Sequence, residues 1–212
     1  MNKTPMRKAV SNHNQLRKCP TGIKGFDQIT EGGLPQNRTT LICGRAGTGK
    51  TLWGLDFLIK GAINFKEPGI FMSFEETEDE LYNDVASLNL DLKGLVSQNK
   101  IRLEYVILDR RDIQETDFNL EGLLIRLEHA IDSIGAKRVV LDSIESLFAG
   151  LTDPGILRLE ITRLFRWLKD TKVTAIITGA SGPDSYTRHG LEECLTDWFI
   201  FLATRLTDQV SI

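Results

Sequence analysis

The chain has 212 residues, of which 41% are hydrophobic, and this length and composition suit one large domain with its own core. Residues 1–18 carry five of the 26 basic residues and none of the 29 acidic ones, which leaves the remainder with 21 basic against 29 acidic residues and a net charge of −8. Such an acidic body is a poor general surface for nucleic acid. No apolar run approaches the ~20 residues that span a bilayer, and the basic start lacks the apolar segment of a secretory signal, so we expect a cytoplasmic protein without a membrane span.

Residues 1–18 are expected to form a disordered basic leader, and residues 19–212 a single domain. The segment 19–35 is rich in loop-forming residues and leads toward the first strand. Its apolar residues Phe26, Ile29 and Leu34 are expected to pack under the sheet.

A complete G-x-x-x-x-G-K-[ST] phosphate-binding motif follows a short apolar strand at 39–43 and opens a helix that should run to about residue 64. Strand, glycine-rich turn and helix N-terminus are the context that this motif requires. Its residues are Gly44, Arg45, Ala46, Gly47, Thr48, Gly49, Lys50 and Thr51.

The residue types in the loop match the chemistry of a nucleoside triphosphate. Gly44, Gly47 and Gly49 are expected to adopt positive φ and to bring backbone N–H groups close to phosphate oxygens, where the helix dipole also favours an anion. Lys50 would reach the β- and γ-phosphates, and the Thr51 hydroxyl would ligate Mg²⁺. The motif therefore predicts a nucleoside triphosphate with Mg²⁺.

The remaining pattern alternates strands with helices. Thr77 and Glu80 form a predicted capping box that opens a helix through residue 88, and amphipathic helices are expected at 120–134 and 156–168. A polar connector at 109–117 and a loop at 179–188 lack such patterns. Further strands are expected at 70–74, 101–106, 139–142, 173–178 and 198–202. This order predicts an α/β fold with a mostly parallel sheet and helices on both faces.

Three acids follow predicted strands, at the edge where open α/β sheets bind ligands. Asp142 ends a short apolar strand, and a carboxylate there can hold the magnesium shell opposite Thr51. Glu75 and Glu76 repel each other unless a cation or a function compensates, and either could polarise a water for attack on the γ-phosphate. Because adjacent residues at a strand end diverge, one of the two is expected to do no chemistry.

Several segments together resemble the KaiC branch of the RecA superfamily, and the resemblance covers residues 19 to about 211. They are Gly25-Phe26-Asp27, Gly32-Gly33-Leu34-Pro35, Gly44 to Thr51, Ser73-Phe74-Glu75-Glu76-Thr77, Leu141-Asp142-Ser143, and Arg188-His189-Gly190 followed by Glu192-Glu193. The resemblance implies a RecA-like P-loop core, Mg·ATP binding, slow hydrolysis with the paired glutamates as water activators, and a hexameric ring with nucleotide between subunits. It also implies a KaiB-like partner, for which the 109–117 connector is the expected contact.

The sequence departs from the family pattern at three places. Glu193 and Cys194 stand where a phosphorylated Ser-Thr pair lies in the family's kinase-competent domain, so the chain resembles the first, ATPase-type domain, and autokinase activity would require a further domain. The strand before the 179–188 loop ends in Gly179-Ala180, where the family often has an acid. The sequence also ends before the family's basic hairpin, which acts on a neighbour's γ-phosphate, so we expect a truncated chain or one domain of a longer protein.

Two other functions remain open. A DNA-dependent recombinase or helicase motor would need basic, aromatic-bearing loops, and the residues of this kind in the 179–188 loop are Tyr186, Arg188 and His189. A non-hydrolysing, ATP-bound signalling scaffold would keep the phosphate loop but not the turnover.

Overall fold

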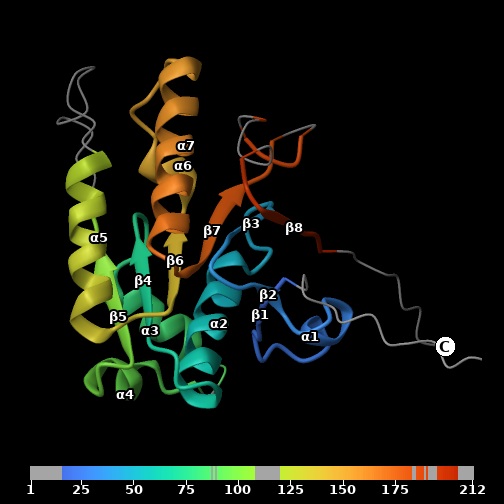
Figure 1. The fold of residues 1–212 in the computed structure, drawn as a ribbon, viewed down its shortest axis with the longest axis vertical. Helices are drawn as coiled ribbons and strands as arrows, with labels where there is room; N and C mark the ends of the chain where they lie inside the picture. The colour runs from blue at the N-terminus through green and yellow to red at the C-terminus, as the bar shows by residue number, and fades with distance from the viewer. Residues whose placement is uncertain are drawn as a thin grey trace, which may run out of the picture.

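The computed structural model describes residues 16–86, 88, 90–107, 120–182, 185–188, 190 and 195–204. Its main sheet has six strands in the order β5-β4-β6-β7-β3-β8, and every neighbouring pair is parallel (Figure 1). The predicted strands are confirmed with small shifts at their ends. Their bounds are Thr39–Gly44 (β3), Gly69–Ser73 (β4), Ile101–Tyr105 (β5), Arg138–Asp142 (β6), Thr174–Ala180 (β7) and Trp198–Leu202 (β8).

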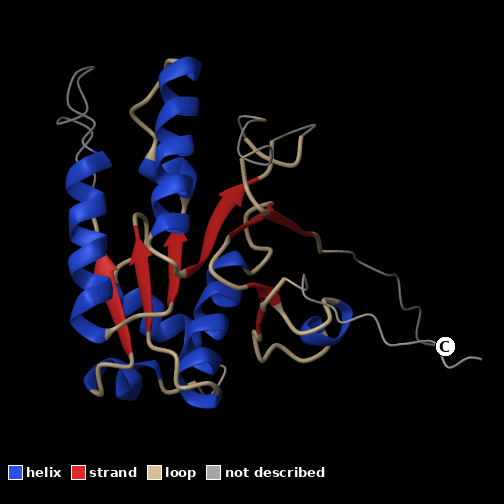
Figure 2. Cartoon of the chain, viewed as in Figure 1, coloured by secondary structure: helices blue, strands red, loops and turns tan. Residues whose placement is uncertain are grey.

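Helices cover both faces of this sheet, as the alternating pattern predicts (Figure 2). Two separate apolar clusters lie between the helices and the strands. One face carries α2 (Lys50–Asn64), α3 (Glu78–Ala86) and α4 (Leu92–Ser97). The other carries α5 (Leu120–Ile134), α6 (Ile144–Leu147) and α7 (Pro154–Asp170). None of the helices in the described part of the chain combines the length and the hydrophobicity that crossing a bilayer requires.

Side-chain caps explain where two of these helices begin. The predicted capping box is confirmed, because the Thr77 backbone N–H donates to Glu80 Oε2 at 2.7 Å; α3 nevertheless ends at Ala86, two residues before the predicted end. The Asp153 carboxylate accepts from the backbone N–H groups of Gly155 and Ile156 at the start of α7.

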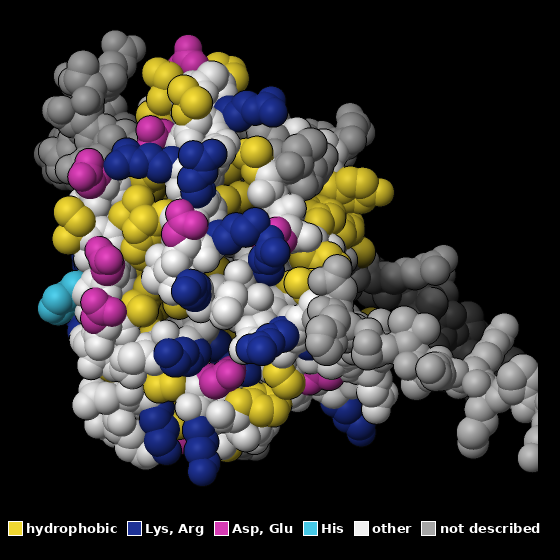
Figure 3. Space-filling model, in the orientation of Figure 1, with side chains coloured by type: hydrophobic (Ala, Val, Ile, Leu, Met, Phe, Trp, Pro, Cys, Tyr) yellow, Lys and Arg dark blue, Asp and Glu magenta, His cyan; other side chains and the backbone are white. Residues whose placement is uncertain are grey.

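The outer face of α5 and α7 carries charges of both signs. Figure 3 shows Asp and Glu side chains along α5 and Lys and Arg side chains over α7. They border a groove of about 380 Å³, across which Arg163 Nη2 lies 3.4 Å from Glu121 Oε2. Acidic side chains on one border of the groove and mostly basic ones on the other differ from a continuous basic stripe of the kind that nucleic acid binds.

The segment before the phosphate loop contains structure that the sequence pattern did not predict. β1 (Lys18–Cys19) pairs antiparallel with β2 (Leu34–Pro35), and a single helical turn, α1 (Phe26–Ile29), lies between them. Leu34 is fully buried, as expected.

The expected burial of Ile29 is wrong, because 81% of this side chain is exposed. The Asp27 carboxylate accepts from the backbone N–H groups of Thr21 and Gly22, which holds the Asp27 side of α1 against that preceding segment. Ile29 comes two residues later and therefore lies on the opposite side of the helical turn. Phe26 packs edge-on against the ring of Trp53 in α2 and lies against the apolar cluster on this face of the sheet.

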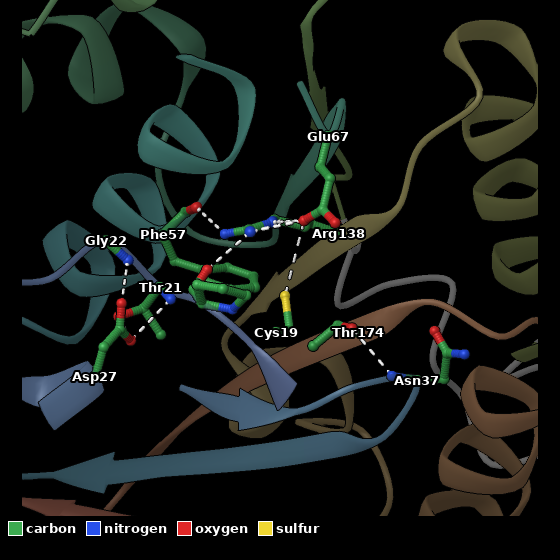
Figure 4. Close-up of polar contacts among 10 residues, drawn as sticks. Cys19, Thr21, Gly22, Asp27, Asn37, Phe57, Glu67, Arg138 and Thr174 are labelled. Carbon is green, nitrogen blue, oxygen red and sulfur yellow. Dashed lines mark hydrogen bonds and ion pairs between the residues drawn. The ribbon is translucent and has the colours of Figure 1, made fainter. Parts of the chain in front are cut away.

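A fully buried arginine joins four segments of the chain (Figure 4). Arg138, at the start of β6, donates to Glu67 Oε2 at 2.7 Å, to the Phe57 carbonyl at 3.0 Å and to the Pro20 carbonyl at 2.8 Å. Its guanidinium also lies 4.4 Å from the centroid of the Phe57 ring. Removing one partner of such a buried pair typically costs about 3–5 kcal/mol, so this cluster fixes α2 and the N-terminal segment against β6.

Two glycines of α2 allow the helix to approach β6 closely. A Cβ on Gly54 would lie 2.8 Å from Val140 Cγ1, and one on Gly61 would lie 2.6 Å from Arg138 Nε. Arg138 and Val140 are two residues apart on β6, so their side chains lie on the same face of the sheet and both point toward α2. The seam between α2 and β6 thus requires small residues on the helix.

We predict that Gly54→Ala destabilises the protein, although alanine in a helix is ordinarily favoured over glycine by about 1 kcal/mol. Contact with Val140 should outweigh this gain and lower the free energy of unfolding by about 1–3 kcal/mol, measured by urea denaturation. The double variant with Val140→Ala is the control, since it removes the atom that the new methyl group meets. An equal loss from Gly54→Ala in both backgrounds would contradict the prediction.

Candidate functional site

The phosphate-loop motif lies between β3 and α2, as predicted. Gly47 and Gly49 have φ values of +76° and +84°, and Gly49 is the N-cap of α2. A Cβ at either glycine would have nothing within 4 Å in the described structure. The loop therefore offers an open cradle at a helix N-terminus, which suits a phosphate group.

The expected positive φ of Gly44 is wrong, since its backbone lies outside the left-handed region. This glycine is required for space, because a Cβ would lie 2.6 Å from both the Leu202 carbonyl oxygen and Thr48 Oγ1. Gly44 thus permits close packing of the loop against β8.

Lys50 folds over the phosphate loop. Its Nζ donates to the carbonyl oxygens of Gly44 and Arg45, each at 3.1 Å. Arg45, Ala46 and Gly47 are exposed at the tip of the loop. An anion in the cradle could replace these carbonyls as the partner of the ammonium group.

Thr51 and Asp142 meet across the edge of the sheet. The Thr51 hydroxyl donates to Asp142 Oδ2 at 2.8 Å, and the Thr178 hydroxyl donates to Oδ1 of the same carboxylate. Burial raises the pKa of Asp142 above its ordinary value, although the hydrogen bonds from Thr178 and Thr51 oppose this effect. A cation here would relieve the cost of burying the charged carboxylate.

The donor set at this point suits magnesium. One hydroxyl and one carboxylate are oxygen ligands of the kind that Mg²⁺ prefers, and Mg²⁺ usually completes its shell with phosphate oxygens and water. Within the described ranges, no three His, Cys, Asp or Glu side chains converge on a common metal-binding point. A metal held only by protein side chains is therefore not indicated there.

Glu75 follows β4 and turns toward α6. Its Oε1 accepts from the Ser143 hydroxyl at 2.6 Å and from the Ser146 hydroxyl. Glu75 is exposed on the wall of a cavity of about 700 Å³, which Ser143, Ser146 and Arg188 also line.

Glu76 turns away from Glu75 into a more acidic environment. Burial, followed by the charges of Asp84 and Asp142, raises the pKa of Glu76 from its ordinary 4.5 to about 7. Its Oε2 is buried and has no hydrogen-bond partner in the described part of the chain. The expected divergence of the two glutamates is confirmed, and their environments differ in both burial and charge.

Residues 19–211 match the family model described as "ATPase: KaiC". The chain belongs to the KaiC family. It is 52% identical over 197 residues to the circadian clock protein KaiC2 of Synechocystis sp., a match that covers 92% of this chain and 35% of that protein. It is 41% identical over 196 residues to the circadian clock oscillator protein KaiC of Prochlorococcus marinus subsp. pastoris, covering 89% of this chain and 38% of that protein.

This KaiC-family chain spans little more than a third of the length of the curated relatives it matches. Family membership, together with the parallel six-stranded sheet, establishes the predicted RecA-like P-loop fold and a nucleotide-binding ATPase domain in general terms.

The structure adds residues to the site that sequence reasoning missed. Thr178 touches Asp142 because β7 lies between the phosphate-loop strand and β6, and strand order cannot be read from spacing. In the sequence, Ser143 stands out only as part of the Leu141-Asp142-Ser143 segment, and no motif includes Ser146. The hydroxyl of Ser73 accepts from the Glu76 backbone N–H at 2.9 Å and holds the turn that separates the two glutamates.

Other predicted residues lie elsewhere. The strand β7 extends to Ala180, so the predicted loop begins later than residue 179. Tyr186 packs edge-on against Phe199 and Phe201 of β8. The connector at 109–117, together with His189, Glu193 and Cys194, falls outside the described residues.

We predict that Glu76→Gln stabilises the nucleotide-free protein relative to the parent, and that this difference in the free energy of unfolding grows as pH increases. The unfolded carboxyl loses its proton near its ordinary pKa of 4.5, whereas the folded one retains it to about 7. The parent therefore loses stability over that window, and glutamine does not. After solvent screening, the gain between about pH 5 and pH 8 should be about 1 kcal/mol in urea denaturation.

The control for this prediction is Glu128→Gln, which changes an exposed carboxylate on α5. A pH-dependent gain of the same size in both variants would contradict the assignment of the effect to Glu76.

Proposed function

We propose that this KaiC-family domain binds Mg·ATP and hydrolyses it slowly, as a conformational switch of the clock type. The observation that carries the proposal is the contact of Thr51 with Asp142 at the mouth of the phosphate loop, with Glu75 and Glu76 at the end of the neighbouring strand β4. Phosphate cradle, magnesium ligands and water-activating acids would then occupy one edge of the sheet.

The phosphate loop would supply most of the binding energy. The N-terminus of α2 begins at the cradle and would bind phosphate oxygens, and Lys50 would exchange its two carbonyl partners for the β- and γ-phosphates. Thr51 and Asp142 would hold Mg²⁺, which neutralises charge developing on the phosphates.

The two glutamates would divide the activation of water. A general base works best when its pKa lies near the working pH, and Glu76, with a pKa of about 7 and a buried oxygen without a partner among the described residues, fits proton acceptance. Glu75, held by two hydroxyls, fits orientation of the water.

We also propose a hexameric ring with nucleotide between subunits and a KaiB-like protein partner. Support comes from family membership and from the similarity to proteins named as circadian clock proteins. Autokinase activity, by contrast, would belong to a further domain.

We predict that the double variant Glu75→Gln/Glu76→Gln retains ATP binding and loses hydrolysis by at least about 100-fold, because the acid–base contribution disappears. Phosphate release measures turnover, and a fluorescent ATP analogue measures binding. Lys50→Ala is the companion variant and should lose binding itself. A parent protein that binds ATP without releasing phosphate would indicate the non-hydrolysing scaffold.

We predict that native mass spectrometry with Mg·ATP detects a hexamer and that removal of nucleotide shifts the distribution toward smaller species. Binding of nucleotide between subunits would stabilise the assembly by mass action. A monomer in every nucleotide state would contradict the ring for this chain.

A further inference from the structure

The short helix α6 directs its polar side chains to tertiary contacts. Ser143 is the N-cap of α6, yet its hydroxyl makes no hydrogen bond to the N–H groups of the helix. It donates instead to Glu75 Oε1. A serine at this position ordinarily caps the first turn, so the local preference has given way to a contact with Glu75, which follows β4.

Ser146 lies one helical turn further on and reaches the same oxygen of Glu75. The two hydroxyl oxygens are 3.3 Å apart. Since both hydroxyls bind Oε1, Oε2 is the oxygen of Glu75 that remains available to a water molecule in the described structure.

Between the two serines, Glu145 reaches the strand on the other side of β6. Its Oε1 accepts from the Ala180 backbone N–H at 2.7 Å, at the end of β7. A Cβ on Gly179 would lie 3.2 Å from that oxygen and 2.9 Å from Cys43 Sγ, so the glycine leaves room for the carboxylate. The helix α6 therefore spans the ends of β4 and β7, which flank the strand that carries Asp142.

We propose that Ser146 is a positioning residue for ATP hydrolysis, which acts by fixing the carboxylate of Glu75. This inference rests on the proposed function of Glu75. A glutamate side chain has several rotatable bonds, and Glu75 borders a cavity of about 700 Å³ into which it could swing. The hydroxyl of Ser146 holds it at the end of β4.

Ser146 tests this role more cleanly than Ser143 does. Ser143 directly follows Asp142, a predicted magnesium ligand, and its replacement would disturb both carboxylates. Ser146 is separated from Asp142 by one turn of α6, and its hydroxyl contacts Glu75 and Ser143.

The experiment compares ATP turnover by the parent, Ser146→Ala and Ser146→Thr. We expect Ser146→Ala to lower kcat by about tenfold or more, because small errors in the placement of a reacting group are costly. KM for ATP should stay within about twofold, since the phosphate loop is unchanged. Threonine restores the hydroxyl and should recover most of kcat.

Ser97→Ala is the matched control, because the Ser97 hydroxyl at the end of α4 donates to the carbonyl of Gly94, away from the site. It should leave kcat and KM unchanged. Parent-like kcat in Ser146→Ala would overturn the inference. So would a loss of kcat that threonine fails to restore and that accompanies a lower melting temperature.

Crystal structures of the parent and of Ser146→Ala supply a readout that does not depend on turnover. The Glu75 carboxylate should shift or split between conformers in the variant, and an unchanged position would overturn the inference. Parent-like turnover in Glu75→Gln/Glu76→Gln would instead refute the proposed roles of the two glutamates, and the crystallographic comparison would still decide whether Ser146 fixes Glu75.

Discussion

The packing of α2 along β6 is the constraint on which the rest of the structure depends. The two elements meet at three levels: Thr51 bonds Asp142, Gly54 rests on Val140, and Arg138 bonds the carbonyl of Phe57 beneath Gly61. Alternate residues of one strand thus face successive turns of one helix. Because β6 supplies the acid at the site and also fixes the direction of α2, the phosphate loop and the carboxylate opposite it cannot move independently.

The edge of the sheet that this packing creates is crowded with negative charge. Asp142 and Glu76 both have raised pKa values, chiefly because of burial, while Lys50 is the cation that leans over the loop. A divalent cation with a nucleotide would rebalance these charges, because it stabilises the ionised forms of the acids. Under the proposed function, the stability that the nucleotide-free protein loses at this edge would be regained when Mg·ATP binds.

The helix α6 and the N-terminal segment show two ways in which tertiary contacts override local preference. Ser143 has the identity and position of a capping residue but bonds Glu75, and Ile29 lies in an apolar pattern but faces solvent because Asp27 holds the other side of α1. Neither outcome is encoded in residues adjacent in the chain. In both, a hydrogen bond to a residue earlier in the chain, five or six residues away for Asp27 and 68 residues away for Ser143, decides which way a short element turns.

The sequence by itself determined the phosphate loop, the six strands, the long helices and the parallel class of the sheet, because a motif of fixed spacing and hydrophobic periodicity are local properties. It also determined that Asp142 ends its strand and that Glu75 and Glu76 follow theirs at the same edge of the sheet. Only the tertiary structure decided that β7 lies beside β6 and brings Thr178 to Asp142, that Gly44 is needed for space and not for its φ, and that Ser146 reaches Glu75. These outcomes depend on strand order and on side chains distant in sequence, and no local pattern records which strands become neighbours.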